Sequence, residues 1–174
     1  MDHPAKYTIG DILKAVDVER ERFKEWTMKG FIESSEKVRQ GKRILHLYSQ
    51  LDAYCIGLFK HLIEKAGLSR ASSAAFCRTW KKEAKELPLN LPGIMWNFLV
   101  FYRRGDEFFW HQLVNLHPHL ADDEEEWWDR ELERALLGTE IQEAIKKYPD
   151  FDNIIVVNFA KIRDGINERL KKLE

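Results

Sequence analysis

The chain has little that would support membrane insertion or secretion. Its apolar run from Met95 to Tyr102 is far shorter than the ~20 residues that a membrane helix needs. The N-terminus is polar where a secretory signal would be apolar, so we expect a cytoplasmic protein with no membrane attachment. Two cysteines, Cys55 and Cys77, fit a reducing compartment, and we expect both to pack within helices.

Signatures of catalysis are also lacking. The sequence has no glycine-rich phosphate loop, no Gly-x-Ser-x-Gly elbow and no His-Glu-x-x-His helix. His111, His117 and His119 follow no standard zinc spacing, and the cysteines lie far from them in sequence. We therefore expect no enzymatic activity, no metal site and no cofactor.

The chain has little net charge, but its charges are unevenly distributed. The formal net charge is -1, yet residues 1–85 hold 17 Lys and Arg against 11 Asp and Glu, a net of +6. Residues 86–174 hold 11 against 18, a net of -7. A basic half beside an acidic half is typical of a DNA-binding part joined to a part with another role.

The first half of the chain is predicted to contain four helices and a hairpin. Apolar residues at helical spacing predict a helix over Ile9–Val16, capped by Thr8, and a second over Glu19–Lys29, ended by Gly30. Phe31-Ile32 is predicted to be a short strand, residues 33–42 a flexible polar wing, and residues 43–48 its second strand. Ser49 and Asp52 predict a capping box for a third helix, which ends at Gly67, and Ser69 opens a fourth that runs to about Lys85.

This order of elements resembles the MerR-type family of winged helix-turn-helix transcription regulators, over about residues 7–69. No single matching segment is specific, but their order and spacing together are. The matching segments are Tyr7–Gly10, Val18, Lys24, Trp26, Gly30–Ile32, Gly41–Arg43, Tyr48-Ser49 and Gly67–Ser69.

The resemblance implies that the helix over Glu19–Lys29 enters the major groove of double-stranded DNA. It implies that Arg20, Arg22 and Lys24 face the DNA and that Lys42 and Arg43 lie on its backbone. The residues themselves agree, because Arg20 and Lys24 are four apart and turn outward if Phe23 packs inward. Arginine can pair with both acceptors of a guanine edge, whereas lysine more often neutralises phosphate.

Two departures from the family pattern leave alternatives open. Glu19, Glu21 and Glu25 place carboxylates in the presumed reading helix, where they would repel phosphate or pair with neighbouring cations. The helix after Ser69 is also too short before Pro88 for the long dimerisation helix of that family. Simple repression, a phage-type DNA-handling factor (excisionase or terminase small subunit) and a protein-interaction module without DNA binding therefore stay open.

The second half is predicted to be a small α+β domain. Residues 94–103 and 107–115 read as two aromatic-rich strands joined by Arg104-Gly105-Asp106, a hairpin with both faces covered. Helices are predicted over residues 126–137 and 139–148, a strand over 153–159 and a closing amphipathic helix over 160–173.

The predicted organisation is thus a DNA-binding domain over residues 1–87 and a C-terminal α+β domain over residues 88–174, divided near Pro88 and Pro92. The aromatic residues of the hairpin are expected to form a core, a homodimer contact or a ligand pocket. We expect a homodimeric regulator whose C-terminal domain dimerises or senses a small-molecule or protein effector.

Overall fold

The computed structural model describes residues 4–84, 96–104, 107–114, 142, 146, 150 and 152–173. By its internal contacts the chain forms two compact units. The first consists of residues 1–88 and 161–174, and the second of residues 89–160. Within the described ranges the fold is mixed α+β, as predicted.

The first helix, α1 (Ile9–Val16), begins and ends as the sequence predicts. The Thr8 side chain accepts a hydrogen bond from the backbone N–H of Asp11, whose carboxylate accepts one from the backbone N–H of Thr8. This capping box satisfies two N–H groups that the helix leaves unpaired. Ile12 and Val16 are buried, and Asp17 ends the helix in the left-handed conformation at φ 55°.

Helix α2 (Arg20–Met28) follows after a short turn. Phe23 and Trp26, which are three residues apart, are both buried and fix the inner side of this helix. The indole of Trp26 packs edge-on against Phe59, with ring centroids 5.0 Å apart. Gly30, at φ 68°, accepts the left-handed turn after the helix with no steric penalty from a Cβ.

The predicted strand at Phe31-Ile32 is wrong, and the first hairpin strand lies further along. Strand β1 spans Glu36–Gln40 and pairs antiparallel with β2 (Arg43–Leu47), whose position the sequence predicts correctly. Ile32 is buried by packing and is not paired in a strand. The alternation of an amphipathic strand is missing in β1 because both faces of this hairpin are largely exposed.

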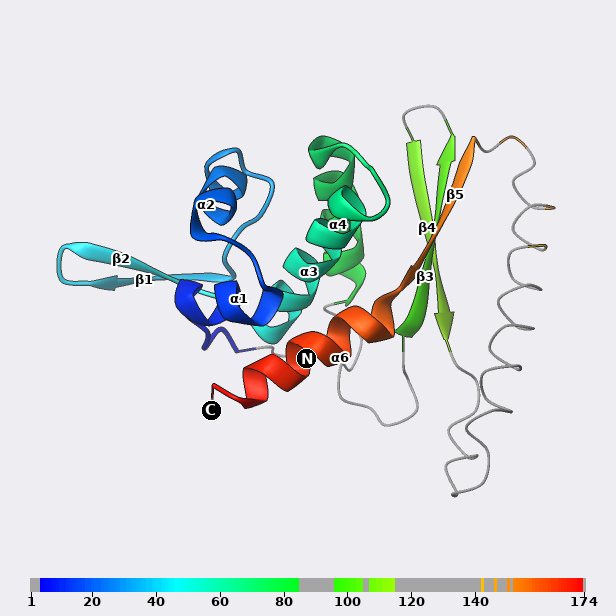
Figure 1. Ribbon diagram of the computed structural model, residues 1–174. Helices are drawn as coiled ribbons and strands as arrows, with labels where there is room; N and C mark the ends of the chain where they lie inside the picture. Colours follow the sequence, from blue (N-terminus) through cyan, green and yellow to red (C-terminus); the bar gives the residue numbers. More distant parts are fainter. Residues whose placement is uncertain are drawn as a thin grey trace, which may run out of the picture. The chain divides into compact units, whose positions relative to one another are not determined.

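A two-residue turn, Gly41-Lys42, joins β1 to β2. The register pairs Gln40 with Arg43, and Gly41 has φ 63° at the first turn position. Positive φ at that position characterises the primed turns that match the twist of paired strands. Figure 1 shows the hairpin extending away from α1 and α2.

Helices α3 (Gln50–Glu64) and α4 (Arg70–Ala84) form the base of the first unit. Ser49 and Asp52 make the predicted capping box of α3, and both residues are buried. The other carboxylate oxygen of Asp52 is ion-paired with Lys81 of α4, so this buried charge is compensated. Trp80, fully buried, is among the largest side chains in the core.

Helix α6 (Phe159–Lys171) returns to the first unit, although its sequence lies beyond the second. Gly57 of α3 allows this approach, because a Cβ there would lie 2.6 Å from Cδ1 of Ile166. Asn167 accepts hydrogen bonds from the Tyr54 hydroxyl at 2.5 Å and from Gln50 Nε2 at 2.8 Å. Residues 161–174 belong to the first unit, whereas the sequence assigned all of residues 88–174 to the C-terminal domain.

The second unit contains a three-stranded antiparallel sheet in the order β4-β3-β5. The predicted hairpin is confirmed as β3 (Trp96–Arg104) and β4 (Glu107–Val114), with Arg104 opposite Glu107. Strand β5 (Asn153–Asn158) pairs on the other side of β3. Leu99, Val100 and Phe101 are consecutive and all buried, so both faces of β3 are covered.

The helices predicted over residues 126–137 and 139–148 lie outside the described residues, apart from the helical positions 142 and 146. His117 and His119 also lie outside them.

Candidate nucleic-acid interface

A concave surface lies where α2 meets the base of the hairpin. Its lining comes from the start of α1, from α2 and from the end of β2 and just beyond it, and consists of Ile9, Arg20, Glu21, Phe23, Lys24, Thr27, Met28, His46 and Tyr48. Buried rings of Phe23 and Tyr48, 5.9 Å apart and edge to face, lie beneath it. Burial, with the nearby Asp52 carboxylate, raises the pKa of Tyr48 to about 12, so its hydroxyl stays protonated.

Arg20 and Lys24 lie together on this surface, as predicted. Both side chains are exposed, whereas Phe23 between them in sequence is only 3% exposed. With Met28, which is 77% exposed, they repeat every four residues along α2. That spacing places all three on one stripe of the helix, which we call the outer face of α2.

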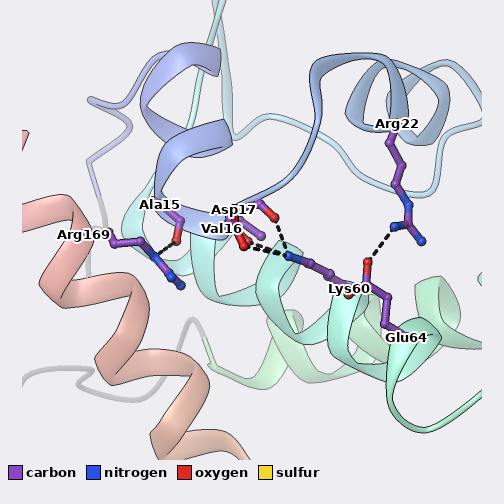
Figure 2. Close-up of polar contacts among 7 residues, drawn as sticks. All are labelled: Ala15, Val16, Asp17, Arg22, Lys60, Glu64 and Arg169. Carbon is purple, nitrogen blue, oxygen red and sulfur yellow. Dashed lines mark hydrogen bonds and ion pairs between the residues drawn. The ribbon is translucent and has the colours of Figure 1, made fainter.

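Arg22 lies on a different side of α2. Its guanidinium donates to a carboxylate oxygen of Glu64 at the end of α3, at 2.7 Å. It also lies over the ring of Trp26, 5.2 Å from the ring centroid. Figure 2 shows the side chain extended toward Glu64. The structure therefore does not bring Arg22 together with Arg20 and Lys24, and its contacts are those of a helix-docking residue.

The three glutamates of the predicted reading helix have different environments. Glu25 accepts hydrogen bonds from Lys29 at 2.9 Å and from Arg70 at 2.6 Å. The hydrogen bond from Lys29, together with the charges of Arg70 and Lys29, lowers the pKa of Glu25 and outweighs its partial desolvation. Glu19 precedes the helix as its cap residue, and Glu21 lines the concave surface. Only Glu21 of the three therefore lies among the lining residues beside Arg20 and Lys24.

The hairpin has two faces, which its register assigns. Residues directly opposite each other in an antiparallel pair share a face, as do alternate residues along a strand. One face, which we call the cationic face, carries Lys37, Arg39, Ile44 and His46; the second face carries Glu36, Val38, Gln40, Arg43, Leu45 and Leu47. His46 lines the concave surface, so the cationic face continues that surface along the hairpin.

The predicted hairpin residues Lys42 and Arg43 are both exposed at the tip. Lys42 is in the turn and Arg43 begins β2 on the second face. Lys37 and Arg39, two further exposed cations, were missed by the sequence prediction. The signal that could have found them is their spacing of two within a short β-segment, which was read as a flexible loop.

The turn between α1 and α2 is held by two cations from distant segments. Lys60 Nζ donates to the carbonyl oxygens of Val16, at 3.3 Å, and of Asp17. Arg169 Nε of α6 donates to the carbonyl of Ala15 at 2.7 Å (Figure 2). Cations at the C-terminal end of a helix satisfy unpaired carbonyls and oppose the negative end of the helix dipole. These two cations therefore fix the position of the C-terminal end of α1, where the turn to α2 begins.

The two cysteines lie between α3 and α4. Cys55 Sγ donates to the carbonyl oxygen of Cys77 at 3.5 Å, and Cys77 is only 3% exposed. Burial raises the pKa of the Cys77 thiol well above its usual range, which keeps it protonated and weakly nucleophilic. Cys77 is therefore buried as the sequence suggests, whereas Cys55 is only half-buried.

Within the described part of the chain, no cluster of three or more His, Cys, Asp or Glu side chains has metal-binding geometry. Among those same residues, no helix combines the length and apolarity needed to span a bilayer. A scan of protein-family models and a search of curated proteins both find no match to this chain.

Proposed function

We propose that this chain is a double-stranded DNA-binding transcription regulator of MerR-like winged-helix type. In this proposal α2 enters the major groove, and the β1–β2 hairpin serves as a wing on the flanking DNA. The supporting observation is that exposed Arg20 and Lys24 share the outer face of α2, beside a hairpin with further exposed cations.

The outer face of α2 suits double-stranded DNA, which offers both phosphates and the hydrogen-bonding edges of its bases. Arg20 can pair with the two acceptors of a guanine edge, and Lys24 can neutralise a phosphate or contact the same edge. The buried rings of Phe23 and Trp26 hold the helix from behind, so these cations lie on a rigid support. In this proposal Arg22 holds α2 against α3, and Lys42 and Arg43 at the hairpin tip contact the DNA backbone.

Matched lysines on α2 test the proposal. Lys24 lies on the concave surface, whereas Lys29 ends the same helix and is bound to Glu25. We expect Lys24→Ala to weaken duplex binding, by about 1–3 kcal/mol if a base contact is lost, or to reduce the salt slope by about 1 if a phosphate contact is lost. Lys29→Ala, which removes the same charge from the helix, should leave affinity close to that of the unaltered protein.

Fluorescence anisotropy with a labelled duplex, measured across a salt series, gives both quantities. The duplex would first be selected from a random pool by the full chain. Binding that does not depend on salt, or equal losses in the two lysine variants, would contradict the assignment of this surface to DNA.

Homodimerisation and effector sensing complete the proposal and are assigned to the second unit. A two-fold symmetric consensus in the selected duplexes would support a dimer, because half-site symmetry mirrors the symmetry of the protein. Light scattering at micromolar concentration provides the direct measurement. A monomer bound to an asymmetric site would contradict the dimer.

A protein-interaction role is the second candidate, and one observation favours it. Met28 and Ile44 are large apolar side chains that are 77% and 63% exposed on or beside the concave surface. Exposed apolar groups rimmed by polar residues are typical of protein-binding sites. The salt series separates the two functions, since a protein-binding surface would show no salt-dependent affinity for duplex DNA.

A further inference from the structure

The cationic face of the hairpin carries one prominent apolar side chain. Ile44 is 63% exposed and lies directly across from Arg39, with Lys37 two residues away on the same strand as Arg39. Leu45, the next residue, is 40% exposed and belongs to the second face, with Val38 opposite it. An isoleucine thus stands between cations on the face that adjoins α2.

The hairpin is long enough to reach a neighbouring groove. Each strand has five residues, which corresponds to roughly 16 Å at ~3.3 Å per residue. Adjacent major and minor grooves of B-DNA are offset by about half of the ~34 Å helical repeat, roughly 17 Å. With α2 in the major groove, the cationic face would come alongside the adjacent minor groove.

The chemistry of Arg39 and Ile44 fits that groove. Narrow minor grooves of A·T-rich DNA have an enhanced negative potential that attracts arginine. Their floor lacks the guanine N2 amine, so an apolar side chain can approach it or wedge into a base step without burying that donor. A contact with phosphates alone would require only the cations and would leave Ile44 exposed.

We infer that the cationic face reads the minor groove, with Arg39 and Ile44 selecting A·T pairs beside the site bound by α2. This inference rests on the proposed function. It adds a specificity determinant that the tip residues Lys42 and Arg43 do not supply. It also accounts for an exposed isoleucine at a position where water would solvate a lysine or threonine side chain more favourably.

The test uses a base that changes only the minor groove. In the duplex selected by the full chain, each A·T pair flanking the α2 site is replaced in turn by 2,6-diaminopurine·T. This base adds an amine to the minor-groove floor and leaves the major-groove edge unchanged. At one or more flanking pairs we expect the affinity of the unaltered protein to fall at least about fivefold, the scale of a single unfavourable base pair.

Three variants locate the contact. Ile44→Ser and Arg39→Gln should bind the unmodified duplex more weakly and should lose most of the response to diaminopurine. Leu45→Ser, a neighbouring apolar-to-polar change on the second face, should keep the full response. Circular dichroism and thermal unfolding of each variant check that the hairpin and the first unit stay folded.

The outcomes separate this inference from the proposed function. Salt-dependent binding with no response to diaminopurine at any flanking pair would overturn the minor-groove inference and leave DNA binding in place. A response that Ile44→Ser retains in full would overturn the role of Ile44. Failure of the full chain to bind any duplex would overturn both, and retention of a protein partner through Met28 and Ile44 would then favour the second candidate.

Discussion

Lys60 offers the sharpest test of how the turn before α2 is held in place. Its ammonium group contacts three oxygens: the carbonyls of Val16 and Asp17, and the Asp17 carboxylate at 3.7 Å. The Lys60 side chain is 22% exposed and that of Asp17 is 83% exposed. The contact with the Val16 carbonyl is therefore part-buried, whereas both contacts with Asp17 are exposed to water.

The magnitudes follow from this difference. A hydrogen bond to a charged group contributes about 1.5–3 kcal/mol, and a cation at a helix C-terminus adds about 0.3–1 kcal/mol. Since part of the ammonium is solvated, we expect Lys60→Met, which keeps the apolar stem, to lower the free energy of unfolding by about 2 kcal/mol. Asp17→Asn removes only the exposed carboxylate and should change it by less than about 0.5 kcal/mol.

Urea unfolding followed by circular dichroism compares the two variants, and DNA affinity measured across a salt series gives a second readout. Lys60 is not among the residues that line the concave surface. Under the proposed function, Lys60→Met should therefore weaken duplex binding by displacing α2, and the salt slope should stay unchanged. If Asp17→Asn destabilises the protein as much as Lys60→Met, the carboxylate is the dominant partner and the reasoning is wrong.

Three further predictions concern the packing and charge around α2 and α3. Gly57→Ala should destabilise the protein by about 1 kcal/mol, because overpacking of about 2 kcal/mol against Ile166 exceeds the ~1 kcal/mol gain in helix propensity. In an Ile166→Val background the same substitution should become close to neutral. If Gly57→Ala stabilised the unaltered protein, the close approach of α6 would be contradicted. Arg22→Ala should lower the free energy of unfolding by about 1 kcal/mol through loss of its Glu64 and Trp26 contacts. Under the proposed function, it should also reduce duplex affinity less than Lys24→Ala does. A larger loss of affinity than that of Lys24→Ala would mean that Arg22 faces the DNA. Glu25 has a pKa below its ordinary value of 4.5, so its contribution to stability is present above pH 4.5 and is lost as the pH falls through the folded-state pKa. Glu25→Gln should therefore flatten the decline in unfolding midpoint below about pH 5. An unchanged slope in that range would exclude the Glu25 ion pairs as its source.

Local patterns predicted the helices well. Thr8 and Ser49 each form the capping box that the acidic residue three positions later indicates, and α1 has the predicted bounds. The hairpin of β3 and β4 is also where its aromatic strands and short connector place it. These features depend on hydrogen bonds and side-chain spacing within a few residues, which a sequence displays directly.

Contacts between segments far apart in the chain could not be predicted from the sequence. The charge of Arg22 was visible, but its direction depends on Glu64, 42 residues away, which only tertiary packing brings within 2.7 Å. The strand Glu36–Gln40 was missed because an exposed hairpin buries neither face and so carries no alternation of apolar and polar residues.

The amino-acid order alone indicates where helices start and stop, which side of α2 is apolar, and that cations gather in the first half of the chain. Which of those cations share a surface depends on the packing of the helices. Arg20 and Lys24 remain exposed together, while Arg22, Lys60 and Arg169 are bound to oxygens of distant segments. This difference arises because the interactions involved act over different distances along the chain. Capping and periodicity act over one or two helical turns, whereas an ion pair between helices depends on the position of a partner that local residues do not encode.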